Sequence, residues 1–245
     1  MDVVQRALTV LHQTIAPAVI DRPFDSIRVG DEGGFAPPVD DETQVLDLLL
    51  ESIDLAGFPT DGSYFQIALD PAANSFYHDD GRYRLRGRWL ESSELASRYA
   101  QLVDSYPIRS IEDGFSERDV RGWQMLHTDL GQRIQIVGDD LYVTDAERIR
   151  RGYGTGCSNA ALIKPNQIGT VSQTFDAIQS AYRSDMRCMV SHRSGETLDT
   201  FIADLAVGAG TGQIKSGAPA RGERVAKYNR LTEIAAQTGL RYGLE

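Results

Sequence analysis

The sequence predicts an α/β fold of the βα-barrel type, with elements in the order α-α-(βα)6. Short apolar strands alternate with amphipathic helices, which favours a parallel sheet covered by helices. Every expected strand runs directly into a charged residue. The 245 residues match the usual size of one barrel, yet only six strands can be recognised. We therefore expect one domain over 1–245, an incomplete barrel.

The elements can be justified in chain order. Residues 3–15 have helical apolar spacing, a Gly-rich loop spans 28–40, and residues 41–43 open a second helix whose buried side runs from Val45 to Ile53. Strands begin to alternate with helices after this second helix. The six expected strands are Phe65–Asp70, Ile108–Glu112, Ile134–Asp139, Ala160–Lys164, Cys188–His192 and Gln213–Lys215.

Local signals mark several helix ends. Ser116 with Asp119, and Thr170 with Gln173, have the spacing of capping boxes and predict helix starts. Gly131 follows a helical stretch as a stop signal.

Composition excludes several classes of protein. With 35 acidic against 25 basic residues the net charge is −10, which repels nucleic-acid backbones. No apolar run is long enough for a membrane span, and no signal-peptide pattern follows Met1. Two cysteines cannot build a disulfide framework. We expect a cytoplasmic protein that binds neither nucleic acid nor membrane.

The basic residues are unevenly divided between two types. Only three of the 25 are lysines, namely Lys164, Lys215 and Lys227. Codon bias explains the ratio, but not the positions. Arginine cannot serve as a neutral base, whereas a lysine can. Lysines kept in an arginine-rich chain therefore mark places where ammonium chemistry is needed.

Charges at the strand ends have an order. They are, in sequence, Asp70, Glu112–Asp113, Asp139–Asp140, Lys164, His192–Arg193 and Lys215. Strand ends meet solvent, so some charge is expected there; three acidic ends followed by three basic ends are harder to explain that way. In βα barrels this edge carries the active site.

The order of acidic and basic strand ends indicates what the site binds. Three neighbouring carboxylates repel one another unless a cation joins them, and oxygen-only ligands favour Mg²⁺ or Mn²⁺. The basic ends would face an anion. We therefore expect a hard cation on one wall of the site and, as substrate, an anionic small molecule that is phosphorylated or carboxylated.

Several segments together resemble the enolase (phosphopyruvate hydratase) family. The resemblance covers nearly the whole chain in family order. Its segments are GDEGGFAP at 30–37, IALD at 67–70, SIED at 110–113, IVGDDL at 136–141, IKPNQIGT at 163–170, VSHRSGET at 190–197 and GQIKSGAP at 212–219. Pro165 departs from the family, in which an apolar Val or Phe often follows the lysine that corresponds to Lys164.

The resemblance implies interconversion of 2-phosphoglycerate and phosphoenolpyruvate. By it, Lys164 takes the proton from C2, and Lys215 pairs with the substrate carboxylate. His192 lines the pocket near the departing hydroxyl, where Glu32 acts as general acid. The remaining implied roles are Mg²⁺ binding by Asp70, Glu112 and Asp139, and phosphate binding by Arg193 and Ser194.

The resemblance also implies that elements are missing. Family members carry an N-terminal domain and two leading barrel strands, giving a ββαα(βα)6 barrel, before the helix at which this chain starts. We therefore expect an N-terminal partner subunit, a homo-oligomer, or both. Two alternatives remain open: a paralogue acting on a phosphonate analogue, similar to carboxyphosphonoenolpyruvate synthase, and a non-catalytic enolase-like binding protein.

Overall fold

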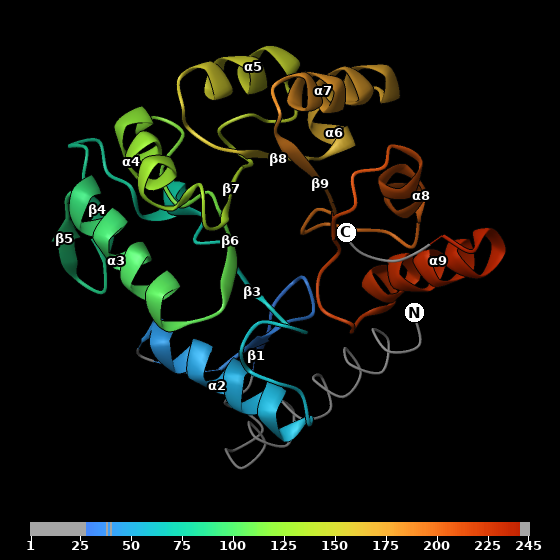
Figure 1. Cartoon of the computed structure of the whole chain (residues 1–245), viewed down its shortest axis with the longest axis horizontal. Coiled ribbons are helices and arrows are strands. Elements are labelled where there is room, and N and C mark those ends of the chain that lie inside the picture. The colour runs from blue at the N-terminus through green and yellow to red at the C-terminus, as the bar shows by residue number, and fades with distance from the viewer. Residues whose placement is uncertain (1–27, 38, 40, 241–245) are drawn as a thin grey trace. The chain divides into compact units, whose positions relative to one another are not determined.

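A computed structural model describes residues 28–37, 39 and 41–240 (Figure 1). The helix expected over 3–15 lies outside these residues. The described chain falls into two compact units. We call Gln66–Met189 the central unit, and the residues up to Phe65 together with those from Val190 onward the terminal unit.

Six strands form one sheet in the order β10-β9-β8-β7-β6-β3, which is the chain order of a βα barrel. Every register determined between neighbouring strands is parallel. The predicted α/β class and all six predicted strands are thus confirmed, with ends that differ by at most two residues. The strands are β3 (Ile67–Leu69), β6 (Ile108–Glu112), β7 (Gln135–Gly138), β8 (Ala160–Ile163), β9 (Arg187–Ser191) and β10 (Ile214–Lys215).

Helices follow the strands of the central unit. In Figure 1, α3 lies beside α4, and α5 beside α7, around strands β6 to β8. Their buried residues recur at helical spacing, as in Trp123, Leu126 and Leu130 of α4. The helices are α3 (Ser92–Ser105), α4 (Val120–Leu130), α5 (Ala146–Gly154), α6 (Pro165–Ile168) and α7 (Val171–Arg183).

Buried strands form the core of the central unit. All four residues of β7 and all four of β8 are buried, which explains why β8 is apolar throughout and why only the first residue of β7, Gln135, is polar. Val137, Ala160 and Leu162 form one apolar cluster with Met189 packed against it. The ends of these strands are therefore held rigidly where the charged residues begin.

The central unit also contains elements that the sequence reading did not anticipate. A 3-10 helix, η2 (Ala73–Phe76), follows β3. A hairpin of β4 (Tyr83–Leu85) and β5 (Arg88–Leu90) precedes α3. Its turn residues Arg86 and Gly87 both have positive φ.

The terminal unit contains the remaining elements. A short antiparallel pair, β1 (Arg28–Val29) and β2 (Phe35–Ala36), encloses the Gly-rich loop. Helix α2 (Glu42–Leu55) starts at the predicted place, capped by Asp41. Helices α8 (Phe201–Gly208) and α9 (Gly222–Thr238) lie side by side (Figure 1).

The predicted helix ends are mostly confirmed. Thr170 caps α7 by accepting a hydrogen bond from the Gln173 backbone N–H, and Gly131 ends α4. The start of α4 differs from the prediction. Its N-cap is Asp119 rather than Ser116, because the Asp119 carboxylate accepts the N–H of Gly122. No helix in the described part of the chain combines the length and apolarity needed to span a membrane.

Candidate active site

The central unit brings four strand ends to one edge of the sheet. Glu112 is the last residue of β6, Asp139 follows β7, and both are buried. Asp70 follows β3 and is exposed, while Lys164 follows β8. Parallel strands place their carboxyl ends at the same edge, which is the active-site edge in barrels of this kind.

Lys164 and Asp139 are in direct contact. The Lys164 ammonium reaches Oδ2 of Asp139, and both side chains are largely buried. The other oxygen, Oδ1, accepts a hydrogen bond of 3.1 Å from the Gln167 amide. Pro165 opens α6 at the first helical position, where its lack of an N–H is harmless, and one turn of this helix carries Gln167 back towards Asp139.

The turn after β7 is held by Asp113. Its two carboxylate oxygens accept the backbone N–H groups of Asp139 and Asp140, at 2.8 and 2.9 Å. Burial raises the pKa of Asp113 to about 7, a rise that the two backbone hydrogen bonds oppose and the nearby Asp139 and Asp140 carboxylates reinforce. The residue before this turn, Gly138, has no room for a side chain, because a Cβ there would lie 2.6 Å from the Tyr142 ring.

These carboxylates fit a hard cation. Asp113, Asp139 and Asp140 each offer an oxygen within 4.8 Å of the others, and all their donors are carboxylate oxygens, which Mg²⁺ prefers. Each of the three also accepts protein hydrogen bonds: Asp113 from two backbone N–H groups, Asp139 from Lys164 and Gln167, and Asp140 from Asn74. The ligands expected from sequence, Asp70, Glu112 and Asp139, share only Asp139 with this group.

A second cluster lies in the terminal unit. His192 follows β9, and its backbone N–H donates to the carbonyl of Lys215 on β10 at 2.9 Å. Its ring nitrogen Nε2 lies 3.2 Å from Oε2 of Glu32. The Ser194 hydroxyl donates to Oε1 of the same carboxylate at 3.4 Å. Three of the residues expected in the site, Glu32, His192 and Ser194, therefore meet here.

The Glu32 carboxylate is strongly acidic in this setting. Its pKa is lowered to about 2, chiefly by the neighbouring His192 ring, opposed by burial and assisted by the positive charges of Lys215 and Arg224. Nε2 of the ring is close to Glu32 but is not aligned for a hydrogen bond. A general acid must carry a proton, which apolar or anionic surroundings favour, and this cluster alone does not supply them.

Comparison with known proteins decides the family. Residues 6–242 match the model described as "Enolase, C-terminal TIM barrel domain". The chain belongs to the enolase family. It is 51% identical over 226 residues to "Enolase 2" of Pseudomonas syringae pv. syringae (strain B728a), covering 91% of this chain and 52% of that protein.

Other enolases give the same picture. The "Enolase" of Acidothermus cellulolyticus is 54% identical over 206 residues, which cover 84% of this chain and 48% of the relative. "Enolase 1" of Methanospirillum hungatei JF-1 is 49% identical over 226 residues, covering 91% and 53%. This enolase domain thus spans about half the length of the curated relatives it matches.

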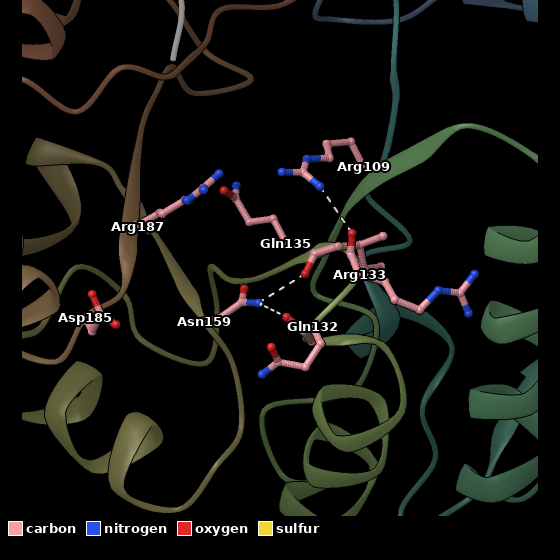
Figure 2. A pocket seen from close by; sticks show the side chains of 9 residues that line it. Arg109, Gln132, Arg133, Gln135, Asn159, Asp185 and Arg187 are labelled. Carbon is pink, nitrogen blue, oxygen red and sulfur yellow. Dashed lines mark hydrogen bonds between the residues drawn. The ribbon is translucent and has the colours of Figure 1, made fainter. Parts of the chain in front are cut away.

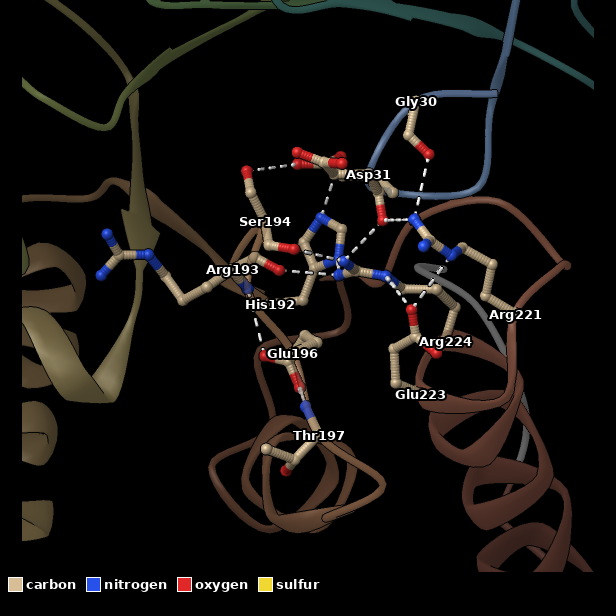
Figure 3. A network of polar contacts seen from close by, with 12 residues as sticks. Gly30, Asp31, His192, Arg193, Ser194, Glu196, Thr197, Arg221, Glu223 and Arg224 are labelled. Carbon is tan, nitrogen blue, oxygen red and sulfur yellow. Dashed lines mark hydrogen bonds and ion pairs between the residues drawn. The ribbon is translucent and has the colours of Figure 1, made fainter. Parts of the chain in front are cut away.

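Two buried supports of the second cluster were not predicted from the sequence. Arg224 and Lys227 lie one turn apart on α9 and are almost completely buried. Figure 3 shows Arg224 between the loop of Asp31 and the segment that starts at His192. Lys227 holds Glu196 and two backbone carbonyls. The scarcity of lysine marked Lys227, but nothing marked Arg224 among so many arginines.

A cavity of about 180 Å³ lies elsewhere in this enolase domain (Figure 2). It is lined by residues at the beginnings of strands, including Arg109 of β6, Gln135 of β7 and Arg187 of β9. The catalytic edge of the sheet is at the ends of the strands. This cavity is therefore separate from the candidate active site.

Proposed function

We propose that this chain is the barrel half of an enolase-type hydro-lyase that interconverts 2-phosphoglycerate and phosphoenolpyruvate. A separate N-terminal subunit would supply the rest of the site. The contact of Lys164 with Asp139 carries the proposal, because it puts an amine beside a metal-type carboxylate at the active-site edge of an enolase-family sheet. Both cysteines are free and buried, which suits the cytoplasm that we propose as its location.

In this proposal Lys164 takes the proton from C2 of the substrate. Loss of this proton places a second negative charge next to a carboxylate, so the step needs positive charge on those oxygens. Mg²⁺, held by Asp70, Glu112 and Asp139, would supply electrostatic stabilisation of that charge when bound. Lys164 must first leave Asp139 and lose its own proton. The flexible four-carbon stem of lysine allows that movement.

The remaining proposed roles belong to residues of the terminal unit. Lys215 would pair with the substrate carboxylate, Arg193 and Ser194 would bind the phosphate, and His192 would line the pocket beside the departing hydroxyl. Glu32 would protonate that hydroxyl. An anionic substrate offsets the positive charges that keep the Glu32 pKa at about 2, which supports proton uptake by Glu32 in the complex.

Reconstitution tests this proposal. The chain is mixed with an N-terminal enolase fragment, Mg²⁺ and 2-phosphoglycerate, and phosphoenolpyruvate is followed by its ultraviolet absorbance. We expect turnover that depends on both chains and disappears in Lys164→Ala. Absence of turnover, with the substrate still bound, would instead favour a non-catalytic binding protein. Turnover only with a phosphonate analogue would favour the specialised paralogue.

A further inference from the structure

Helix α9 directs two cations into the terminal unit. Arg224 and Lys227 are 1% and 0% exposed, respectively. Burying a charge is costly unless hydrogen bonds satisfy it, so the partners of each cation show what it supports. Lys227 contacts Glu196 as well as two carbonyls. Arg224 has no carboxylate within hydrogen-bonding distance among the described residues; the nearest, on Glu223, is 4.0 Å away.

Arg224 instead donates to neutral acceptors around Glu32 and His192. Its Nη1 donates to the carbonyl of Arg193 at 2.7 Å, and its Nη2 to those of Ser194 and Asp31 at 2.8 and 3.1 Å. Nη1 also contacts Nδ1 of His192. One guanidinium therefore joins the loop of Glu32 to the segment of His192 (Figure 3).

The contact with Nδ1 has a chemical consequence. A guanidinium only donates hydrogen bonds and stays charged in proteins, so Nδ1 must present its lone pair to Arg224. A neutral imidazole carries its proton on the other nitrogen. That nitrogen, Nε2, is buried and lies 3.2 Å from Glu32.

We propose that Arg224 is a positioning residue that fixes the His192 ring as the tautomer with its proton on Nε2, the nitrogen beside Glu32. Second-sphere partners set the tautomers of functional histidines in the same way in metal sites. The catalytic meaning rests on the proposed function, since a donor fixed towards Glu32 holds that side chain where the hydroxyl would leave. The tautomer itself does not depend on turnover.

Arg221 provides a matched control. It lies just before α9, and its Nη1 donates to the carbonyls of Gly30 and Asp31 at 3.2 and 2.7 Å. It therefore binds the same loop with the same chemistry. Its hydrogen bonds within the described part of the chain do not reach the His192 ring, so its loss should loosen the loop without changing the tautomer.

Nitrogen NMR of the full chain, labelled with ¹⁵N-histidine, tests the proposal at neutral pH. His192→Gln assigns the signal. In the wild type we expect a pyridine-type Nδ1 and a pyrrole-type Nε2. In Arg224→Met the two shifts should move towards each other, and in Arg221→Met they should not. A protonated Nδ1 in the wild type, or an unchanged ring in Arg224→Met, overturns the proposal.

A second variant covers the case in which Arg224→Met does not fold. Glu32→Gln removes the charge facing Nε2 from a half-exposed side chain, and folding should survive. If Arg224 sets the tautomer, the Nε2-protonated form persists in Glu32→Gln. Its loss there would mean that Glu32, not Arg224, determines the tautomer. None of these spectra requires catalysis, so they can fail independently of the lyase proposal.

Discussion

The ammonium group of Lys164 contacts the carboxylate of Asp139, and so joins the ends of the neighbouring strands β8 and β7. In the reconstituted system, Lys164→Ala should slow α-proton exchange of 2-phosphoglycerate by about 10²–10⁴-fold, the usual contribution of a general base. Loss of a competing cation should leave Mg²⁺ binding at least as tight. Exchange by NMR and Mg²⁺ titration by calorimetry measure the two effects.

Lys164→Arg is the matched variant. It keeps the positive charge beside Asp139 but cannot be deprotonated. We expect it to be as inactive in exchange as Lys164→Ala. Wild-type exchange in either variant would remove Lys164 from the role of base.

Asp113 should influence metal binding through backbone geometry. Asp113→Ala leaves the N–H groups of Asp139 and Asp140 without their acceptor, at about 1–3 kcal/mol for each donor that stays buried. The turn should loosen and Mg²⁺ should bind more weakly in calorimetry. Asp119→Ala, which removes the cap of α4 in the same unit, should lower stability without changing Mg²⁺ affinity. Equal effects of both variants on affinity would contradict this assignment.

The stability of the chain should depend on Glu32 at acid pH. Its pKa is about 2 when folded against 4.5 ordinarily, so its contribution is complete above pH 4.5 and disappears as the pH falls from 4.5 towards 2. The side chain is 42% exposed, so water screens this to about 1 kcal/mol. Urea unfolding at a series of pH values should show a shallower acid decline in Glu32→Gln than in the wild type. Glu51→Gln, on an exposed position of α2, should follow the wild type.

Lys227 should resist replacement even by arginine. Its ammonium donates to Glu196 and to the carbonyls of Thr197 and Glu223. Lys227→Met leaves the largely buried Glu196 carboxylate without its cation, at about 3–5 kcal/mol. Lys227→Arg brings a planar fork into a space that fits a compact ammonium, so it should also destabilise. Chemical denaturation measures the free energy of unfolding of both variants. If Lys227→Arg is as stable as the wild type, only the charge at this position matters.

Gly217 should be intolerant of any side chain. With φ at +80°, a Cβ would lie 2.7 Å from the Glu32 carbonyl oxygen, 2.9 Å from Arg224 and 3.1 Å from His192. Gly210 has φ at +64° but no atom within 4 Å of its Cβ position. Gly210→Ala should cost about 1 kcal/mol from backbone strain alone, and Gly217→Ala about 1–3 kcal/mol more. If Gly217→Ala and Gly210→Ala have similar free energies of unfolding, the atoms close to Gly217 are not the cause of its intolerance.

The elements that could be predicted from the sequence are those with a clear local pattern of apolar and charged residues. The strands could be located because each passes from a buried apolar run to a charge, as β8 does at Lys164. The hairpin at Tyr83–Leu90 was missed because arginines occupy most of its exposed positions and Arg86–Gly87 is not a common turn pair. Asp119 was overlooked as a cap because Ser116 has the same spacing signal.

The contacts between residues of the candidate site could not be predicted from local sequence patterns. Arg224 reaches Asp31 across 193 positions of the chain, and no periodicity predicts such a contact. The role of Asp113 follows from its left-handed backbone, with φ at +43°, which aims its carboxylate at the next turn. The residue types at the strand ends were visible in the sequence; their partners depended on the fold.

The two compact units hold candidate residues for different chemical tasks. The carboxylates and the proposed base belong to the central unit, whereas the residues proposed to bind the phosphate, the substrate carboxylate and the departing hydroxyl belong to the terminal unit. Each unit has its own internal supports: Asp113 in the first, Arg224 and Lys227 in the second. Cation affinity and anion affinity can therefore vary independently, and measuring both would show which unit a damaging substitution has affected.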